Sequence, residues 1–379
     1  MVSGLALFSR LAGGSTAPAL LGSDLLPIAR KYRRGSRAVG GYYIASFMLS
    51  EEDLSRAQLT ELYNLWLGCR LVETSFVKES WEGQIVEMRL FQDGVEMMQA
   101  LYPDLLKNRV KALYQDTVGS QADTGWDENE DSSDIYGTCE WVEVLGGATS
   151  TGATMQRDSL LTDFAWPRSR IVGGDARCQG NEEVIPDLLQ VMVGGYWGTL
   201  NWTYRTSSTT DGASDLVETL VGESEFVTTG RIETNADSVR VDCFPIPRRR
   251  GDVLREIIKQ GDSSKNVWQG GVYEDRKFVY EPAPTDWTYQ LRDGELLDKA
   301  GVAVVLSLVK PGFLLYNPSA PTGWPRPGTA SLWDNPEIRY VDEVEYVVGE
   351  KVDELLMRYY GVQEGAAAVT ARRIQGGNL

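Results

Sequence analysis

Alternation of apolar and polar residues is the main pattern along this chain, and a period of two predicts β-strands. The pattern first appears over residues 40–49, where aromatic and β-branched side chains are bounded by glycine. It continues over residues 70–116 and is broken by short turns such as the one at residues 92–94. We therefore predict an antiparallel meander whose central strand opens at Trp81 and Gly83.

Three segments instead repeat their apolar residues with the period of an α-helix. Residues 51–67 follow Ser50, a good N-cap residue, and precede Gly68, which favours a helix end. Residues 148–164 predict a second helix, and residues 253–260 predict a third. The core face predicted for the first helix consists of Leu54, Leu62, Leu65 and Trp66.

The second half of the chain again predicts strands. They are expected over residues 187–205 and 216–244, in a hairpin at 271–282, and over residues 301–312 and 338–349. The whole pattern predicts an α+β fold that is dominated by antiparallel β-structure, with a few short helices. The predicted segments are a basic N-terminal arm at 1–37, a β-rich domain at 38–125, a second β-rich domain at 126–247, and a C-terminal α+β domain with a loose tail at 248–379.

Composition narrows the classes of function. The net charge of the 379-residue chain is −17, which disfavours a protein that coats nucleic acid through phosphate contacts. The chain has no histidine, and this excludes histidine-based triads, metal sites and pH switches. No apolar run reaches the length of a membrane-spanning helix. The four cysteines form no C-x-x-C pair, so we expect buried thiols rather than a zinc site or disulfides at Cys69, Cys139, Cys178 and Cys243.

Acidic side chains crowd the stretch DENEDSSD at residues 127–134. A calcium loop, a catalytic carboxylate cluster and a solvated turn are the three interpretations. Three residues match the first positions of an EF-hand loop, but Ser132 replaces its glycine and Thr138 stands where the bidentate glutamate is required. We therefore expect no bound metal and favour a solvated turn that caps a short helix. The matching residues are Asp127, Asn129 and Asp131.

The motifs of covalent and phosphate chemistry are missing from the sequence, which has no P-loop, no G-x-S-x-G and no G-x-G-x-x-G after a strand. Glycoside hydrolysis needs two carboxylates across a sugar, but among 54 acidic residues some pair can always be chosen. Eleven tryptophans could line a sugar cleft, although alternating aromatics on strands are more often core. We expect no enzyme activity and no cofactor, and keep a glycan-binding or glycan-cleaving β protein as the alternative.

Residues 1–37 differ in charge from the rest of the chain, with six basic residues and one acidic residue. One interpretation is a partly ordered tail. The other is an arm that docks on an acidic surface of a neighbouring subunit, because opposite charge lowers the repulsion between acidic copies. In either case we expect the rest of the chain to fold without this segment. The clustered basic residues are Arg30, Lys31, Arg33, Arg34 and Arg37.

Several motifs, taken in their order, resemble the hub or tail-tip proteins of long-tailed, siphovirus-like bacteriophages. A strand and helix over residues 41–68 come first, and a W-E-G-x-I/V strand follows. Next come a loop with S-x-x-x-Y-G, a small-residue helix that ends in W-P-R, the hairpin, and a closing strand NPEIRYVDEVEY. The resemblance covers roughly residues 40–350. The two shorter motifs are carried by Trp81, Gly83, Ser132, Tyr136 and Gly137.

The resemblance implies a structural protein of a virus tail without an active site. Hub proteins are typically trimers in which each chain supplies two tube-like β-barrel or sandwich domains, so that three chains match a six-fold tube. A trimer is our first expectation and a hexamer the second. The ring would enclose the channel through which DNA leaves, and an acidic wall would repel phosphate.

The resemblance also implies partners and a location. The expected partners are the tail tube protein, the distal tail protein, the tape measure protein and the receptor-binding or fibre proteins. The protein would reside in the virion tail after synthesis in the host cytoplasm, and the distal tail ring protein is the alternative within this class. Ser132 to Tyr136 would form a tight helical turn with Gly137 as its exit, and its role would be scaffold geometry.

Overall fold

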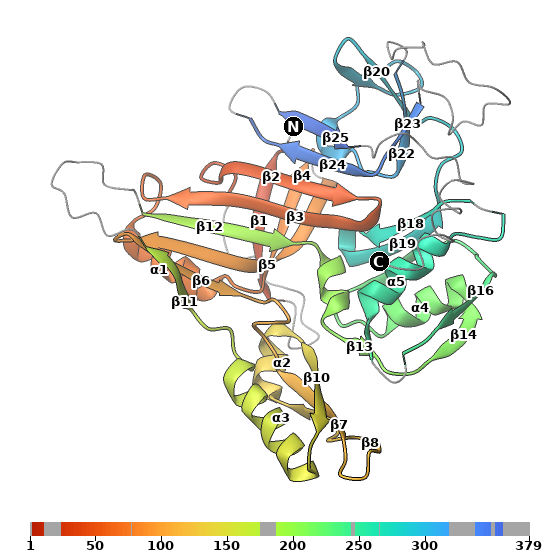
Figure 1. Cartoon of the computed structure of the whole chain (residues 1–379). Coiled ribbons are helices and arrows are strands. Elements are labelled where there is room, and N and C mark those ends of the chain that lie inside the picture. The colour runs from red at the N-terminus through yellow and green to blue at the C-terminus, as the bar shows by residue number, and fades with distance from the viewer. Residues whose placement is uncertain are drawn as a thin grey trace.

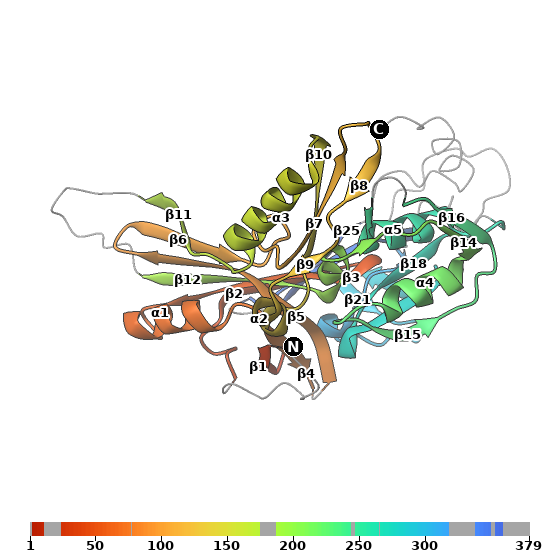
Figure 2. The same ribbon diagram turned by 90° about the horizontal axis from the view of Figure 1, so that it is seen from below.

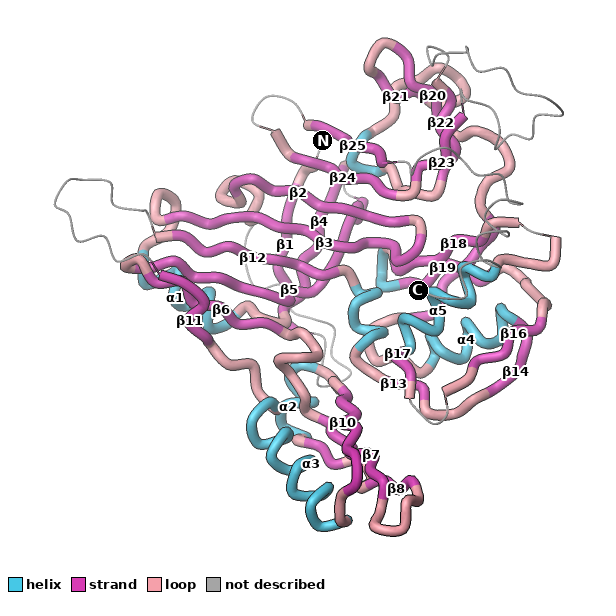
Figure 3. Tube along the Cα trace, in the orientation of Figure 1, coloured by secondary structure: helices cyan, strands magenta, loops and turns pink. Residues whose placement is uncertain are grey.

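One large sheet organises the molecule. The computed structural model describes residues 2–10, 24–76, 78–174, 187–243, 247–264, 266–317, 338–349 and 353–358. Thirteen strands in these ranges form a single sheet, which crosses the centre of the molecule in Figures 1 and 3. Its strands are β1 (Gly4–Arg10), β2 (Arg30–Arg37), β3 (Val39–Ser50), β4 (Cys69–Ser75), β5 (Lys78–Gln92), β6 (Val95–Ala100), β11 (Arg170–Gly174), β12 (Leu188–Gly194), β15 (Thr228–Ile232), β18 (Trp268–Val272), β19 (Lys277–Pro282), β24 (Glu343–Val347) and β25 (Glu354–Arg358).

The main path through this sheet is β1-β4-β5-β12-β3-β18-β19-β15. Side branches add β6 and β11 next to β5, and β2, β24 and β25 next to β3. Most pairs are antiparallel, while β3–β18 and β15–β19 are parallel. The sheet therefore takes strands from all four segments that were predicted from the sequence.

Four smaller sheets surround the large one. The sheet of β7–β10 carries the parallel pair β7–β10, and the sheet of β20–β23 lies at the top of Figure 1. The predicted β-dominated α+β class with antiparallel sheets is confirmed, and none of the sheets in the described ranges closes into a barrel. The strands are β7 (Arg109–Gln115), β8 (Gln121–Asp123), β9 (Asp127–Glu128), β10 (Glu140–Gly147), β13 (Tyr204–Arg205), β14 (Thr209–Gly212), β16 (Ser238–Val241), β17 (Arg248–Arg249), β20 (Tyr289–Arg292), β21 (Glu295–Leu297), β22 (Phe313–Tyr316) and β23 (Ile338–Val341).

Helices are short and lie outside the large sheet. One of them, α3, packs on β7 and stands away from the body together with β7, β8 and β10 (Figures 1 and 2). We call residues 109–164 the projecting module. No helix in the described ranges is both long and apolar enough to cross a membrane. The helices are α1 (Arg56–Leu65), α2 (Glu130–Tyr136), α3 (Ser150–Phe164), α4 (Ala213–Gly222) and α5 (Arg250–Gln260), with 3-10 turns η1 (Tyr196–Asn201), η2 (Glu274–Arg276) and η3 (Leu306–Leu308).

The N-terminal segment is part of the large sheet, and the prediction of a dispensable arm is wrong. β1 pairs with β4, and β2 lies between β3 and β24. Leu5, Leu7 and Tyr32 are buried in the main core. Removing residues 1–37 would therefore delete two strands, one of them internal to the sheet. Residues 11–23 of the predicted arm and 360–379 of the predicted tail lie outside the described residues.

Arg34 explains why this basic segment is internal. Its guanidinium forms an ion pair with Glu73, with Nη2 3.1 Å from Oε1, and both side chains are at most 1% exposed. Tyr32 and Ser80 also donate to the Glu73 carboxylate, at 2.7 and 2.5 Å. Arg34 also donates to the carbonyl oxygen of Ser307. A buried charge needs a partner and further hydrogen bonds, and here the fold supplies both.

The first predicted helix exists, but it is shorter and turned differently. It begins after Ser55, whose side chain forms a capping box with Gln58, rather than after Ser50. Its buried residues are Leu59 and Tyr63, and Leu65 is 55% exposed. The core face of the helix therefore includes Leu59 and Tyr63 rather than Leu65. Of the other predicted contacts, Trp66 is buried, while Leu54 and Leu62 pack against the core and are partly buried.

Strand predictions failed where two periods compete. Residues 196–201 form the 3-10 turn η1, because their aromatic side chains all enter one core instead of alternating between two faces. Residues 213–222 form helix α4, in which the apolar spacing of three and four outweighs the β-branched content. Its buried residues are Ala213, Leu216, Val217, Leu220 and Val221.

One further strand prediction was wrong, and another was right except that the strand is divided in two. Residues 301–312 were expected to form a buried strand, but they contain the turn η3 and a single β-bridge at Ala303, and residues 301–303 are exposed. Residues 338–349 form two strands in different sheets, with Asp342 between them. The meander β4-β5-β6, the helices α3 and α5 and the hairpin β18–β19 are confirmed, whereas β7 belongs to a separate sheet. Buried free thiols are confirmed for Cys69, Cys139 and Cys243, and Cys178 lies outside the described residues.

Substitution of one partner of the buried ion pair tests its importance. We expect Arg34→Met to lower the free energy of unfolding by about 3–5 kcal/mol, because it leaves the Glu73 carboxylate buried without a cation. The double variant R34M/E73Q is expected to regain most of this loss. Arg33→Met is the matched control, since Arg33 is 64% exposed at the side chain and lies 3.9 Å from Glu345. Denaturant titration measures all three, and equal losses for R34M and R33M would contradict the expectation.

Candidate functional site

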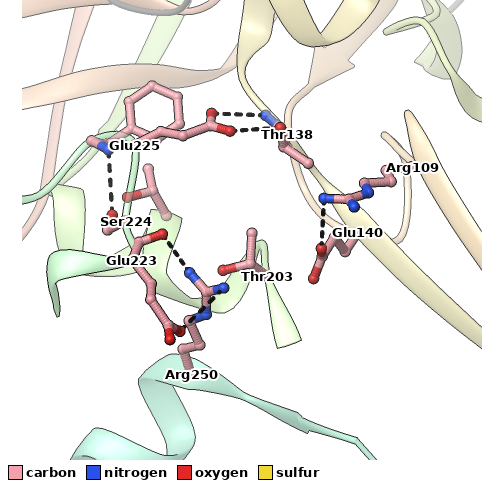
Figure 4. A pocket seen from close by; sticks show the side chains of 10 residues that line it. Arg109, Thr138, Glu140, Thr203, Glu223, Ser224, Glu225 and Arg250 are labelled. Atoms are coloured by element: carbon pink, nitrogen blue, oxygen red, sulfur yellow. Dashed lines mark hydrogen bonds and ion pairs between the residues drawn. The ribbon is translucent and has the colours of Figure 1, made fainter. Parts of the chain in front are cut away.

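A small polar cleft lies at the base of the projecting module, between β10, η1 and the ends of α4 and α5 (Figure 4). It holds about 100 Å³, whereas sites for small organic ligands usually measure about 300–1,000 Å³. Its size therefore suits a few water molecules rather than a substrate. The lining residues are Arg109, Thr138, Glu140, Thr199, Thr203, Glu223, Ser224, Glu225, Phe226 and Arg250.

The charged side chains of the cleft are engaged with one another. Arg109 Nη1 lies 3.3 Å from Glu140 Oε1, and Arg250 Nη2 lies 3.5 Å from Glu223 Oε2. The carboxylate of Glu225 accepts hydrogen bonds from the backbone N–H and the hydroxyl of Thr138, at 3.1 and 2.6 Å (Figure 4). These last contacts cross from the module to the body, so the cleft works as a joint.

Glu140 is the most enclosed carboxylate of this joint. Burial raises the pKa of Glu140, while the backbone N–H of Tyr204, which donates to it at 2.7 Å, and Arg109 oppose the shift. A general base would need a free carboxylate next to a nucleophile, but both oxygens of Glu140 have partners within the fold. The arrangement fixes the module against the body.

Most of the acidic stretch at residues 127–134 forms the start of helix α2, which lies next to this joint. Asn129 caps the helix by accepting a hydrogen bond from the N–H of Ser132 at 3.0 Å. Asp127 pairs with Arg157 at 3.0 Å, so its oxygen is used within the module. Asp131 lies in the first turn of the helix, where its negative charge interacts favourably with the helix dipole. No group of metal-ligating side chains is found within the described ranges, these residues included.

The S-x-x-x-Y-G residues lie where the module meets the rest of the chain. Ser132 is fully buried and donates to the carbonyl oxygen of Ala165 at 2.5 Å. Tyr136 lies beneath the guanidinium of Arg10, whose carbon is 5.2 Å from the ring centroid. Gly137 has φ of 85°, and a Cβ atom there would overlap the ring of Phe226. The expected helical turn with a glycine exit is what α2 and Gly137 form.

Trp81 and Gly83 have a similar packing role on β5. Trp81 is fully buried and donates from Nε1 to the carbonyl oxygen of Gly35 at 3.3 Å. A Cβ atom on Gly83 would overlap the Trp81 ring and the carbonyl oxygen of Gly194. Glycine is therefore required where β5, β12 and the tryptophan ring meet. Within the described ranges five tryptophans are buried, which weakens the sugar-platform alternative: Trp66, Trp81, Trp197, Trp202 and Trp268.

The clustered basic residues lie on β2 but have different surroundings, because side chains alternate between the two faces of a strand. Arg30 pairs with Glu52 at 2.6 Å, and Arg37 pairs with Glu343 at 3.1 Å. Lys31 is exposed and has φ of 53°. Burial removes Arg34 from the set that a neighbouring subunit can reach. An assembly role for Arg30, Lys31, Arg33 and Arg37 stays a prediction.

A second group of titratable residues was missed in the sequence. Glu79 and Glu82 of β5 accept hydrogen bonds from the backbone N–H groups of Asp275 and Arg276 in the turn η2. Asp275 and Arg276 both have positive φ, 57° and 58°, a backbone conformation that costs energy for residues other than glycine. The two carboxylates therefore stabilise a strained turn between β18 and β19. The W-E-G motif includes Glu82, but the motif gives no indication that this carboxylate is buried.

The ionisation of this group is unusual. Burial raises the pKa of Glu82 to about 7, the neighbouring Glu79 adds to the shift, and Arg70 opposes it. Arg70 serves both carboxylates, with Nη2 2.5 Å from Glu82 and 3.6 Å from Glu79. One shared cation does not offset the burial of two carboxylates, so Glu82 titrates near neutral pH.

Comparison with known proteins gives no family. No family model matches the chain, and no curated protein matches it. Among solved structures, the chain is similar to the tail protein from Neisseria meningitidis MC58, with 9% identity over 95% of this chain and 98% of that chain and a TM-score of 0.41. It is also similar to the 43 kDa tail protein of prophage MuSo2 from Shewanella oneidensis, with 9% identity over 97% and 99% and a TM-score of 0.34. Similarity at this level does not establish a shared fold or function.

Gly137→Ala tests the joint between the module and the sheet. The positive φ alone should cost about 1–3 kcal/mol of unfolding free energy, and the overlap with Phe226 should add to it. Gly146→Ala is the control, because a Cβ atom on Gly146 would meet no other atom within 4 Å and the residue has no positive φ. Thermal and denaturant unfolding measure the difference. A G137A protein as stable as G146A would show that the joint tolerates a side chain.

The raised pKa of Glu82 predicts a pH dependence of stability. The folded state binds this proton more tightly than the unfolded chain, so the contribution is fully present below about pH 4.5 and is lost as the pH rises through about 7. Glu82→Gln should flatten the fall in unfolding free energy between about pH 5 and pH 8. Glu79 and Glu140 also have raised pKa values and leave some slope in the variant. An unchanged slope in E82Q would contradict the assignment.

Proposed function

We propose that this protein is a structural component of a bacteriophage tail, at the tail tip or baseplate hub. Copies of the chain form a symmetric ring that closes or extends the tail tube and lets DNA pass. A trimer is the first choice and a hexamer the second. The partners are the tail tube, distal tail, tape measure and receptor-binding or fibre proteins, and the location is the virion.

The observation that carries the proposal is the place of the motif residues on which the resemblance rests. Trp81 and Gly83 pack where β5 meets β2 and β12. Ser132, Tyr136 and Gly137 lie where the projecting module meets the body. All five residues make packing contacts that fix how neighbouring elements lie against one another. Such a role is expected for the motif residues of a structural protein.

Two further observations support a structural rather than a catalytic role. The charged groups of the polar cleft are engaged within the fold, so its carboxylates Glu140, Glu223 and Glu225 already have partners. The net charge of −17 would also keep DNA from binding to a channel wall, because like charges repel. A ring that DNA must pass benefits from both properties.

The test is the location of the chain in purified virus particles. Particles are prepared with an epitope-tagged copy of the chain and imaged by electron microscopy after gold labelling of the tag. We expect label at the tail end remote from the head and three or six copies per particle by quantitative mass spectrometry. Particles that carry the untagged chain are the control for the antibody. Absence from particles, label on the head, or one copy per particle would overturn the proposal.

A further inference from the structure

Two neighbouring carboxylates of β5 hold the turn η2 against the large sheet. Glu79 Oε1 accepts a hydrogen bond from the backbone N–H of Asp275 at 3.3 Å, and Glu82 Oε1 accepts one from the backbone N–H of Arg276. Both residues of the turn have positive φ, 57° and 58°, which is unfavourable for residues other than glycine. The turn would relax if these two hydrogen bonds were lost, so its conformation depends on the carboxylates.

The two carboxylates share a single cation at close range. Arg70 of β4 lies 2.5 Å from Glu82, which is fully buried, and 3.6 Å from Glu79. Glu274 and Asp275 of the turn add negative charge next to Glu79. Burial and the charge of Glu79 raise the pKa of Glu82 to about 7, and burial also raises the pKa of Glu79. The pair therefore keeps one proton up to neutral pH.

Two further groups lie beside the pair, and neither supplies a second cation to it. Arg276 donates from Nη1 to the carbonyl oxygen of Phe226 at 3.3 Å and has no ion pair with either carboxylate among the described residues. Tyr196 of η1 is buried, and burial raises the pKa of its hydroxyl well above the usual value, so it stays neutral. Nε of Arg276 and the hydroxyl of Tyr196 are buried without a hydrogen-bond partner in the described part of the chain. Opening of the turn would give both groups access to water.

We propose that Glu79 and Glu82 form a proton-operated latch on the turn η2. With one proton bound to the pair, the turn stays attached to β5. Loss of that proton leaves two buried negative charges beside one cation, and the strained turn then detaches while the strands on either side stay paired. This conformational switch goes beyond the structural role proposed above and does not depend on it.

The turn also contacts two other parts of the molecule. Tyr42 of β3 donates from its hydroxyl to Glu274 Oε1 at 2.6 Å, and Lys310 lies 2.5 Å from Oε2 of the same carboxylate. Lys310 comes shortly before β22, a strand of the β20–β23 sheet. Detachment of η2 moves Glu274, so the proton on the latch also affects the contact between the large sheet and the segment that leads into β22.

Hydrogen exchange of the purified full chain measures the latch, because the two amides that it holds are adjacent in the sequence. Exchange of residues 273–277 is followed by mass spectrometry between about pH 5.5 and pH 8.5, with each rate corrected for the intrinsic pH dependence of amide exchange. The pKa of Glu82 is about 7 in the attached state and takes its ordinary value of 4.5 once exposed, so protection should fall roughly 30-fold over this range. Strand β12 should stay protected throughout.

Variants separate the charge of the latch from its shape. Glu82→Gln keeps the shape of the side chain but cannot ionise, so protection of residues 273–277 should change little with pH, apart from the contribution of Glu79. Glu233→Gln is the matched control, because Glu233 is 53% exposed at the side chain, and it should behave as the wild type. The turn at Asp293, with φ of 51° and exposed residues 292–294, is an internal control for a strained turn without a latch.

Three results would overturn the latch. They are a corrected protection of residues 273–277 that does not change with pH, exchange of these residues only together with β12, and an E82Q variant with the pH dependence of the wild type. If E82Q does not fold by circular dichroism, E79Q takes its place. Removal of the Glu79 charge lowers the pKa of Glu82, so the midpoint should move to lower pH, and an unchanged midpoint would count against the latch. None of these results affects the particle labelling, so the proposed function is tested separately.

Discussion

The Arg34–Glu73 ion pair lies where β2, β4 and β5 meet. It connects segments of the chain that are far apart in the sequence. Arg34 also donates to Ser307, which is 273 residues away, and its guanidinium lies 5.0 Å from the Tyr346 ring. Neither charge can be buried until the other and the surrounding hydrogen-bond donors are in place. The pair therefore joins the N-terminal strands to segments near the end of the described chain.

The large sheet has the same long-range character. β1 lies at one edge of the sheet, and β2 pairs with β24, so residues near the start and near residue 345 must meet before the sheet is complete. Contacts between such distant residues are costly in loop-closure entropy and form slowly. The projecting module is simpler, since β7 to α3 follow one another in sequence. It is attached through a polar joint, and the joint fixes its direction.

Charge is distributed in two ways. Inside the fold, buried carboxylates accept hydrogen bonds: Glu73 accepts from Arg34, and Glu82 accepts from the backbone N–H of Arg276. On the surface the acidic excess of the chain remains.

Features that depend on neighbours within about ten residues could be predicted from the amino-acid order alone. Period-two alternation located β3, β5 and the hairpin β18–β19, helical period located α3 and α5, and the S-x-x-x-Y-G spacing located the turn α2 with its glycine exit. At η1 and α4 the sequence was compatible with a strand as well as with a helical turn, and tertiary packing decided between them. Distant segments determine whether such a segment is buried on one side or on both. Packing also placed the clustered arginines of the predicted arm in β2, a strand that lies between β3 and β24. A run of arginines ordinarily predicts an exposed segment. Arg34 can be buried because Glu73, on another strand, pairs with it, and the sequence around Arg34 does not indicate that partner.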